Sequence, residues 1–380
     1  MNRRSPISVF GCKVGPEELA EVKSSFDRQW LGIGEKVQAF EAQFARRLDL
    51  GGFVMLDSGS NSLNLAVSLL DLPRGTEVIL PSFTWLSCAH AVLLAGCVPV
   101  FADVDLRTQN ITVDTIRPCI SPRTGAIMVV HYAGKPVRMK EVMALGYPVI
   151  EDAAHAVDSR LDGQSCGAIG AIGIFSFDAV KNLAVGEGGG LTARDPATLA
   201  RARAMRYCGI EKSGFQQAAN PASQGRWWEY DIAHVCHKYL PSDVTASIGL
   251  AQLRKLDMHQ AIRKRIWDRY QHEFADVEWL VRPADAEPDE RHSYFTYCVR
   301  ILPERGSGVN RRDRFARYLL DRGIYTTLRY HPLHMNRIYN SQARLPVSEQ
   351  LNEEALSLPI HPNLDDADID HIVATVRGFN

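Results

Sequence analysis

The chain has 380 residues, 46% of them hydrophobic and 23% charged, which is typical of a globular protein with two domains or one large domain with an appendage. The formal net charge is −1 and no basic block stands out, which argues against a nucleic-acid-binding protein. No stretch reaches the roughly 18–20 continuous apolar residues of a membrane span, and the first residues lack the apolar core of a signal peptide, so we expect a cytoplasmic protein without a membrane partner.

Residues 16–49 have the pattern of two helices, separated by the glycines of "WLGIGEKV". From about residue 50 to residue 195, short apolar runs alternate with helical patterns such as "NSLNLAVSLLDL" and "CAHAVLLAG". The runs with the pattern of strands are "GFVMLDSGS", "EVILPSF", "VPVFADV", "AIMVVHY" and "PVIEDAA". This alternation predicts an α/β fold built from βαβ units around a parallel sheet.

The last third of the chain has a different pattern. One long helix is predicted from residue 242 to about residue 274, followed by a strand at "YFTYCVRIL" and a closing helix at "DADIDHIVATVRGF". We therefore expect a large domain over residues 1–245, which includes the N-terminal helical segment, and a smaller C-terminal α+β domain over residues 246–380.

Polar and aromatic residues lie where the predicted strands end, namely at residues 58–61, Trp85, His131 and Asp152. Ligands of open parallel sheets bind at the carboxyl ends of the strands. These residues are therefore candidates for a common binding site.

Asp152 and Lys181 form the most informative pair. An acid at a strand end is often a helix N-cap, and a lysine before a glycine-rich loop is usually on the surface. A lysine that forms a Schiff base with pyridoxal phosphate, however, needs a partner acid at the far end of the ring and a lowered pKa. Asp152 in "PVIEDAAHAV" and Lys181 in "FSFDAVKNLAVGEGGG" meet the first requirement in type and in order.

Other candidates have an ordinary alternative beside the functional one. "SGSNS", at residues 58–62, is either a capping turn or a phosphate site at a helix N-terminus. Trp85 is either a core residue or a flat ring lying on a cofactor. His131 and His155 are either satisfied core histidines or partners of a cofactor or substrate.

Two further motifs are weaker. "LRYHPLH", at residues 328–334, is either a polar turn or a source of substrate contacts through Arg329, Tyr330 and His331. "GEGGG" lacks the spacing of a phosphate loop, and we interpret it as a tight turn after Lys181. The eight cysteines are scattered and include no CxxC pair, so we expect reduced thiols and no metal site.

The combined series resembles, over nearly the full length, the DegT/StrS-type sugar aminotransferases, a branch of the fold-type I pyridoxal-phosphate enzymes. The resemblance rests on "FEAQFARRL", "SGSNSLNLA", "EVILPSFTW", "VPVFADVD", "VIEDAAHA", "GAIGAIGIFSFDAVKNLAVGEGGG", "LPSDVTASIGLAQLRKLD" and "LSLPIHPNL", in this order. It implies a large domain with a mostly parallel sheet and a smaller C-terminal α+β domain.

The resemblance also implies residue roles. Lys181 would carry pyridoxal 5'-phosphate and move the proton, Asp152 would bond the pyridine nitrogen, and His155 would lie against the ring oxygen. Trp85 would stack on the ring. The phosphate would be bound by Gly59, Ser60, Asn61 and Ser176.

The chain departs from this family at one site. Many relatives have an asparagine near "NYRM" or "KYNM" that reaches the phosphate of the neighbouring subunit, whereas the matching stretch here is "HKYLPSD". Lys238 and Tyr239 are the candidates to replace that contact. A related branch that removes a hydroxyl has histidine in place of the lysine, so Lys181 argues against that branch.

The resemblance implies an aminotransferase that moves an amino group from glutamate or glutamine to a keto-sugar linked to a nucleotide. It also implies a homodimer with shared active sites and small-molecule substrates. The alternatives are a pyridoxal-phosphate enzyme that acts on a keto-cyclitol or dehydrates a sugar, and a non-enzymatic relative that binds a ligand.

Overall fold

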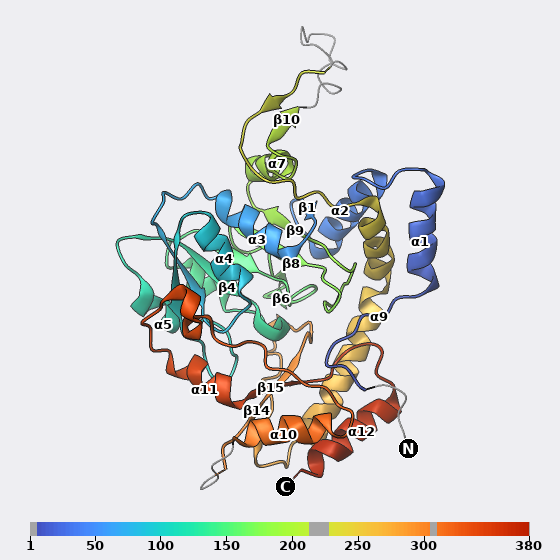
Figure 1. The fold of residues 1–380 in the computed structure, drawn as a ribbon, viewed down its shortest axis with the longest axis vertical. Helices are drawn as coiled ribbons and strands as arrows, with labels where there is room; N and C mark the ends of the chain where they lie inside the picture. The colour runs from blue at the N-terminus through green and yellow to red at the C-terminus, as the bar shows by residue number, and fades with distance from the viewer. Residues whose placement is uncertain (1–5, 213–227, 305–309, 380) are drawn as a thin grey trace.

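The structure, a computed structural model, describes residues 6–212, 228–304 and 310–379. Its centre is a seven-stranded sheet in the order β1-β9-β8-β5-β4-β2-β3 (Figure 1). The strands are β1 (Val54–Leu56), β2 (Glu77–Pro81), β3 (Val98–Ala102), β4 (Thr124–Val130), β5 (Val149–Asp152), β8 (Ile172–Ser176) and β9 (Gly189–Ala193). The strands from β8 to β3 pair in parallel, and β9 runs antiparallel to both β8 and β1. The predicted α/β fold with a mostly parallel sheet is confirmed.

Helices cover both faces of this sheet, as a parallel sheet requires. They include α3 (Gly59–Ser68), α4 (Ser87–Leu94), α5 (Val113–Ile116), α6 (Met139–Met143) and α7 (Pro196–Met205). Alternate residues of β2 join different cores: Val78 and Leu80 pack with α3 and α4, whereas Ile79 packs with Ile116 and Met139. The near-continuous apolar runs in the sequence therefore reflect strands that are buried on both faces.

The N-terminal helical segment consists of α1 (Pro16–Asp27) and α2 (Glu35–Leu48), and both helices pack against the long helix α9 (Asp243–Glu273). The Ser242 hydroxyl caps α9 by accepting a hydrogen bond from the Thr245 N–H at 3.1 Å. Phe40 and Phe44 of α2 contact Phe177, which follows β8, and this aromatic cluster fixes the helices beside the sheet.

The C-terminal region has a separate hydrophobic core around a three-stranded antiparallel sheet. Its elements are β12 (Leu280–Val281), β14 (Tyr297–Ile301), α10 (Arg311–Leu320), α11 (Pro346–Glu354), β15 (Ala355–Leu358) and α12 (Asp366–Arg377). Residues from the second half of α9, such as Trp267 and Tyr270, belong to this core, as does Ile7. The division of the chain after residue 245 stays a prediction.

Short elements complete the described fold: η1 (Arg117–Cys119), η2 (Tyr132–Gly134), β6 (Arg160–Leu161), β7 (Gln164–Ser165), β10 (Ile210–Lys212), β11 (Asp231–Ile232), β13 (Glu290–Arg291), η3 (Leu333–Met335) and η4 (Arg337–Tyr339). β10 and β11 pair as a two-stranded ribbon that projects from the body of the molecule (Figure 1). Among the described helices, none has the length and apolar character needed to cross a membrane.

The "GEGGG" stretch differs from the tight turn that the sequence predicts. Gly186 has a positive φ of 93° and forms the turn, but Gly189 and Gly190 already belong to β9. A Cβ atom on Gly189 would lie 2.5 Å from the backbone N of Gly59, so a larger residue would displace the start of α3. The glycines therefore allow β9 to run directly under the residues that open α3.

Candidate active site

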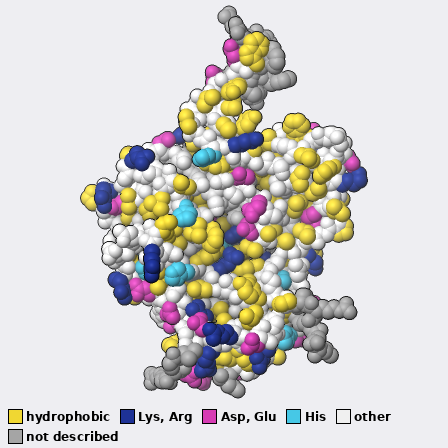
Figure 2. All heavy atoms as spheres, viewed as in Figure 1, with side chains coloured by type: hydrophobic (Ala, Val, Ile, Leu, Met, Phe, Trp, Pro, Cys, Tyr) yellow, Lys and Arg dark blue, Asp and Glu magenta, His cyan; other side chains and the backbone are white. Residues whose placement is uncertain are grey.

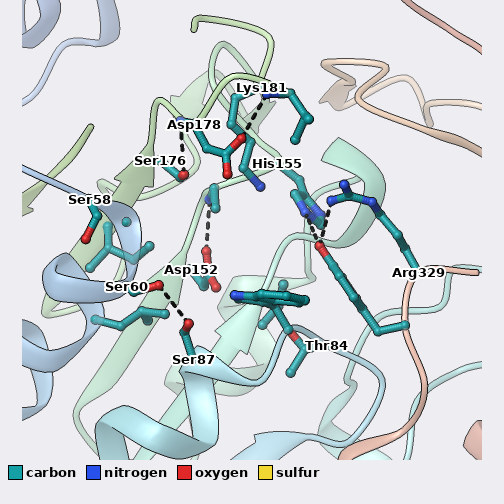
Figure 3. Close-up of a pocket in the computed structure, with 18 of the residues that line it drawn as sticks. Ser58, Ser60, Thr84, Ser87, Asp152, His155, Ser176, Asp178, Lys181 and Arg329 are labelled. Carbon is teal, nitrogen blue, oxygen red and sulfur yellow. Dashed lines mark hydrogen bonds between the residues drawn. The ribbon is translucent and has the colours of Figure 1, made fainter. Parts of the chain in front are cut away.

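A cavity of about 470 Å³ opens at the carboxyl ends of β1, β2, β4, β5 and β8 (Figure 3). Its lining includes Ser58, Gly59, Ser60, Thr84, Trp85, Ser87, Asp152, His155, Ser176, Asp178, Lys181, Glu187, Arg329 and Tyr330. Most of these residues lie in the loops and helix starts that follow the strands of the sheet, and the segment before η3 supplies the last two. Segments far apart in the sequence thus meet at the place where parallel sheets bind ligands.

Lys181 is a lysine of the cavity lining. Its side chain is buried, and Nζ lies 4.8 Å from the centroid of the Phe295 ring. Burial, together with the positive charge of Arg329, lowers the pKa of Lys181 from 10.5 to about 8. A substantial fraction of the amine is therefore neutral, and nucleophilic, near physiological pH.

Asp152 ends β5 and is also buried. Its Oδ1 accepts a hydrogen bond from the Ala154 N–H at 2.9 Å, and Oδ2 lies 3.3 Å from Sγ of Cys88. Burial raises the pKa of Asp152, and the Ala154 N–H and Lys181 act in the opposite direction. A cationic group bound beside Oδ2 would stabilise the carboxylate form.

His155 and Arg329 lie on one side of the cavity (Figure 3), and the Tyr330 hydroxyl joins them. The His155 Nε2 and the Tyr330 hydroxyl lie 3.1 Å apart, and Nη1 of Arg329 donates to the same hydroxyl at 3.2 Å. The His155 ring stacks on Phe295 at a centroid distance of 4.1 Å. Burial and the charges of Lys181 and Arg329 hold the pKa of His155 well below its usual value, so the imidazole is neutral.

The start of α3 forms an anion-binding turn. The Ser58 hydroxyl accepts a hydrogen bond from the Asn61 N–H at 3.1 Å and caps the helix. Within the described residues, the N–H groups of Gly59 and Ser60 have no hydrogen-bond acceptor. They lie at the positive end of the helix beside the Ser176 side chain, which a Cβ on Gly59 would approach to 2.7 Å. The geometry suits a phosphate group.

Trp85 presents an aromatic surface at the mouth of the cavity. Its side chain is 50% exposed, and its ring centroid lies 5.6 Å from that of Tyr330. A large aromatic ring that is half exposed inside a cavity can stack on a planar ligand.

Five predicted site residues do not line this cavity. The Asn61 side chain donates to Asp57 at 2.8 Å, and His331 is exposed and pairs with Asn352. Lys238 is exposed, and Tyr239 is half-buried, with its carbonyl accepting from the Asp57 N–H.

His131 is the fifth of these residues. It is fully buried, and its Nε2 lies 2.9 Å from Oε2 of Glu151 while Nδ1 accepts from the Val137 N–H at 3.0 Å. Because Nδ1 accepts from a backbone N–H, the ring proton lies on Nε2, which donates it to Glu151. The pair braces β4 against β5 behind the cavity.

The structure adds lining residues that the sequence analysis missed. Thr84 and Ser87 flank Trp85, and the Ser87 and Ser60 hydroxyls are 2.7 Å apart. Asp178 and Glu187 lie on either side of Lys181 in the chain. These four residues could have been predicted from the sequence, because each lies close to a predicted site residue and residues near one strand end can face the same cavity.

The chemistry of the cavity fits a phosphorylated pyridine. The free amides at the start of α3 suit its phosphate, and the buried Asp152 suits a protonated ring nitrogen. Lys181 offers a buried amine for covalent attachment, and the buried Nδ1 of His155 has no hydrogen-bond partner within the described residues. Among these same residues, no group of three or more metal-ligating side chains occurs.

Comparison with known proteins agrees with this chemistry. Residues 13–377 match the model of the DegT/DnrJ/EryC1/StrS aminotransferase family. The chain is 38% identical to the dTDP-4-dehydro-2,3,6-trideoxy-D-glucose 4-aminotransferase of Saccharopolyspora spinosa, over 94% of this chain and 92% of that protein.

Solved structures agree as well. The aminotransferase TlmJ from Streptoalloteichus hindustanus has a TM-score of 0.91 and 37% identity, with 98% of each chain covered. The PMP form of the putative sugar aminotransferase Spr1654 from Streptococcus pneumoniae has a TM-score of 0.88 and 25% identity, over 97% of this chain and 96% of that chain. The resemblance found in the sequence is thus confirmed over nearly the full chain: this protein belongs to the DegT/DnrJ/EryC1/StrS family and is a pyridoxal-phosphate-dependent aminotransferase with the fold-type I architecture.

Proposed function

We propose that this enzyme transfers the amino group of glutamate or glutamine to the keto carbon of a nucleotide-linked keto-sugar, at position 4 of the sugar. The proposal draws its substrate from the relative of Saccharopolyspora spinosa, whose name specifies a dTDP-linked 4-keto-sugar. The single observation that supports the chemistry is the placement of the buried side chains of Lys181 and Asp152 in one cavity. We expect the reaction to take place in the cytoplasm.

Arg329 is the proposed binding residue for the carboxylate of the amino donor. Its guanidinium lies over the Phe10 ring at 4.0 Å and lines the cavity. No carboxylate lies within 4.0 Å of it in the part of the chain that the structure describes. A partly buried cation without an anionic partner attracts a carboxylate, and guanidinium groups bind carboxylates in a bidentate manner.

The residues divide the chemistry between them. When bound, pyridoxal phosphate supplies an electrophilic carbon and a ring that accepts an electron pair. Asp152 would hold positive charge on the ring nitrogen, and Lys181, neutral in part because its pKa is about 8, would remove a proton from the donor and return it. The turn at Gly59 and Ser60 would hold the phosphate, and Trp85 would stack on the ring.

Incubating the purified enzyme with a dTDP-linked 4-keto-6-deoxy sugar and nitrogen-labelled glutamate or glutamine tests the proposal. Mass spectrometry should detect labelled nitrogen in place of the carbonyl oxygen of the sugar nucleotide. A dehydrated sugar without nitrogen would indicate the dehydration alternative. Amination of a keto-cyclitol, with none of the sugar nucleotide, would overturn the assignment of the acceptor.

The reaction of Lys181 with its cofactor should depend on pH. The rate of covalent attachment of pyridoxal phosphate to the cofactor-free protein should rise with pH through a midpoint near the Lys181 pKa of about 8. Only the neutral amine attacks, and its fraction grows as the pH passes the pKa. Absorbance of the covalent complex, recorded against pH, measures this midpoint.

The Arg329→Gln variant tests whether the charge of Arg329 contributes to the low pKa of Lys181. Because Arg329 lowers the pKa of Lys181, its loss should move the midpoint to higher pH. A midpoint at the ordinary lysine value of 10.5, or one that Arg329→Gln leaves unchanged, would contradict the electrostatic explanation.

We also propose a homodimer with shared active sites. The β10–β11 ribbon projects from the body (Figure 1), and Figure 2 shows hydrophobic side chains on this projection. Tyr230, Ile232 and Val235, which lie in or beside β11, are exposed. An isolated two-stranded ribbon is marginally stable in water, so a covering surface would stabilise it. In a two-fold dimer, this ribbon and the adjacent Lys238 and Tyr239 would serve the cofactor phosphate of the partner.

Mixing two inactive variants should restore activity if the sites are shared. One is Lys181→Ala, and the other combines Lys238→Ala with Tyr239→Phe, which keeps the ring that packs against the core of its own chain. The heterodimer would have one site with both defects and one site with neither, so about half of the wild-type activity per dimer should return. Heterodimers that form without regaining activity would refute the shared site.

A further inference from the structure

A second cavity lies away from Lys181, between the turn that follows β3 and the strands β12 and β14. Its volume is about 310 Å³, and a small adjoining cavity shares part of its wall. The lining consists of Asp105, Leu106, Arg107, Gln109, Val281, Arg282, Pro283, Ala284, Cys298 and Arg300. It shares no residue with the active-site cavity.

Three arginines line this cavity, and they differ in whether a carboxylate pairs with them. Arg107 pairs with Glu287 at 2.7 Å, and Arg300 pairs with the buried Glu354 at 2.8 Å. Arg282 donates to the Gln271 carbonyl, and no carboxylate lies within 4.0 Å of it among the described residues. At least one positive charge is therefore not neutralised by an ion pair.

Asp105, an acid in the lining, bonds to its own loop. Oδ1 of Asp105 accepts hydrogen bonds from the N–H groups of Arg107 and Thr108 at 3.1 and 2.7 Å, and from the Thr108 hydroxyl at 2.8 Å. These bonds hold the turn that carries Arg107. The Asp105 carboxylate thus stabilises the loop, and Arg282 is the lining arginine for which the described residues supply no ion pair.

A buried amide adds a second, uncharged feature. Gln109 is 5% exposed, lines both adjoining cavities, and its Oε1 has no hydrogen-bond partner within the described residues. A buried carbonyl oxygen without a donor costs free energy, which a ligand hydroxyl can recover after a small rotation of the amide. Leu106, Val281 and Pro283 supply an apolar wall.

We propose that this second cavity binds a small sugar phosphate. Guanidinium groups bind phosphate oxygens strongly and in a bidentate manner, which assigns the anionic part of the ligand to Arg107 and Arg282. The volume exceeds that of a single phosphate ion and falls at the lower end of the roughly 300–1,000 Å³ of small-molecule sites, so a hydroxylated body fits beside the anion. Gln109 would accept from one of its hydroxyls.

Tyr132 connects this cavity to the active site. Its hydroxyl lies 3.6 Å from Sγ of Cys298, a lining residue of the second cavity. The same hydroxyl donates to the carbonyl of Arg329, which lines the active-site cavity. Occupancy of the second cavity should therefore change the KM for the amino donor, for which Arg329 is the proposed binding residue.

Calorimetric titration of the cofactor-loaded enzyme with glucose 1-phosphate tests the binding. The Arg107→Gln, Arg282→Gln double variant should bind glucose 1-phosphate at least about tenfold more weakly, because two charge-assisted contacts are lost. Both side chains reach the surface, so this variant should keep the fold. Arg337→Gln, a substitution of an exposed arginine outside the lining, should bind like the wild type.

Three further titrations test which part of the ligand is recognised and which cavity binds it. Glucose should not bind, and inorganic phosphate should bind more weakly than glucose 1-phosphate. Arg329→Gln separates the two cavities, since binding at the active site would weaken in this variant and binding at the second cavity would not. Equal binding by the wild type and the double variant, or loss only in Arg329→Gln, would overturn the proposal. Equal affinity for inorganic phosphate would overturn the assignment of a sugar.

Steady-state kinetics with and without glucose 1-phosphate test the connection through Tyr132. Glucose 1-phosphate should shift the KM for glutamate in the wild type and leave it unchanged in the double variant. An unchanged KM in the wild type, with binding shown by calorimetry, would overturn the coupling. Since calorimetry needs no turnover, failure of the binding proposal is distinguishable from an error in the proposed acceptor sugar.

Discussion

Replacing Lys181 with alanine should abolish transamination while pyridoxal phosphate still binds without a covalent bond. A positioned general acid–base group is worth roughly 10²–10⁴ in rate, and Lys181 also provides the attachment point, so we expect a loss of at least about 10⁴-fold in kcat. The proposed cofactor contacts at Gly59, Ser60, Trp85 and Asp152, which line the same cavity, do not depend on the lysine side chain. Single-turnover assays and equilibrium dialysis of the cofactor measure the two effects separately.

Borohydride reduction of the wild type gives the matching positive result. The reduced cofactor should be recovered on the peptide that contains Lys181 and should be absent from the alanine variant. Lys135→Ala is an unsuitable control, since that buried lysine pairs with Glu290 at 2.6 Å, whereas the exposed Lys140, which lies outside the cavity lining, serves the purpose. A label on any other lysine, or a near-normal kcat in the alanine variant, would refute the assignment of Lys181.

The central sheet was predictable because each parallel strand is buried on both faces and therefore appears as a short apolar run. The antiparallel strand β9 was not, because it begins with Gly189 and Gly190. Gly189 lacks a side chain because β9 passes close to the residues that open α3. This contact is tertiary, so the sequence shows no periodic hydrophobic pattern at β9.

The candidate site shows the same limit. His131 and His155 both follow predicted strands and are equivalent by sequence position. Only the pairing of β4 with β5 places His131 beside Glu151, whereas His155 faces the cavity. Which side chain turns toward a ligand depends on neighbours that the sequence pattern does not specify.

Arg329 and Tyr330 illustrate the case where a weak motif was informative. They lie in the C-terminal part of the chain, yet the fold brings them to the cavity beside His155. In contrast, His331 points to Asn352, although it is the next residue in the same motif. The motif located the segment, and the tertiary structure decided which of its side chains reach the site.

Replacing Asp152 with asparagine should lower kcat by about 10²–10³-fold, as removal of a preorganised electrostatic group does in other active sites. Asparagine is nearly isosteric and its oxygen can still accept from the Ala154 N–H, so the fold should persist. The uncharged amide, however, cannot hold a proton on the ring nitrogen. The negative charge that develops during proton removal would then be less stabilised, because a charge-assisted hydrogen bond is roughly twice as strong as a neutral one.

Glu187→Gln is the matched control for this variant. It removes a negative charge from the same cavity, but the Glu187 side chain is exposed whereas Asp152 is buried, so the effect on kcat should be small. Cofactor affinity should fall only modestly in Asp152→Asn, since the phosphate and stacking contacts remain. Equal kcat values for Asp152→Asn and the wild type would rule out the electrostatic role. Equal losses in both variants would show that the net charge of the cavity, and not the buried carboxylate at the end of β5, controls the reaction.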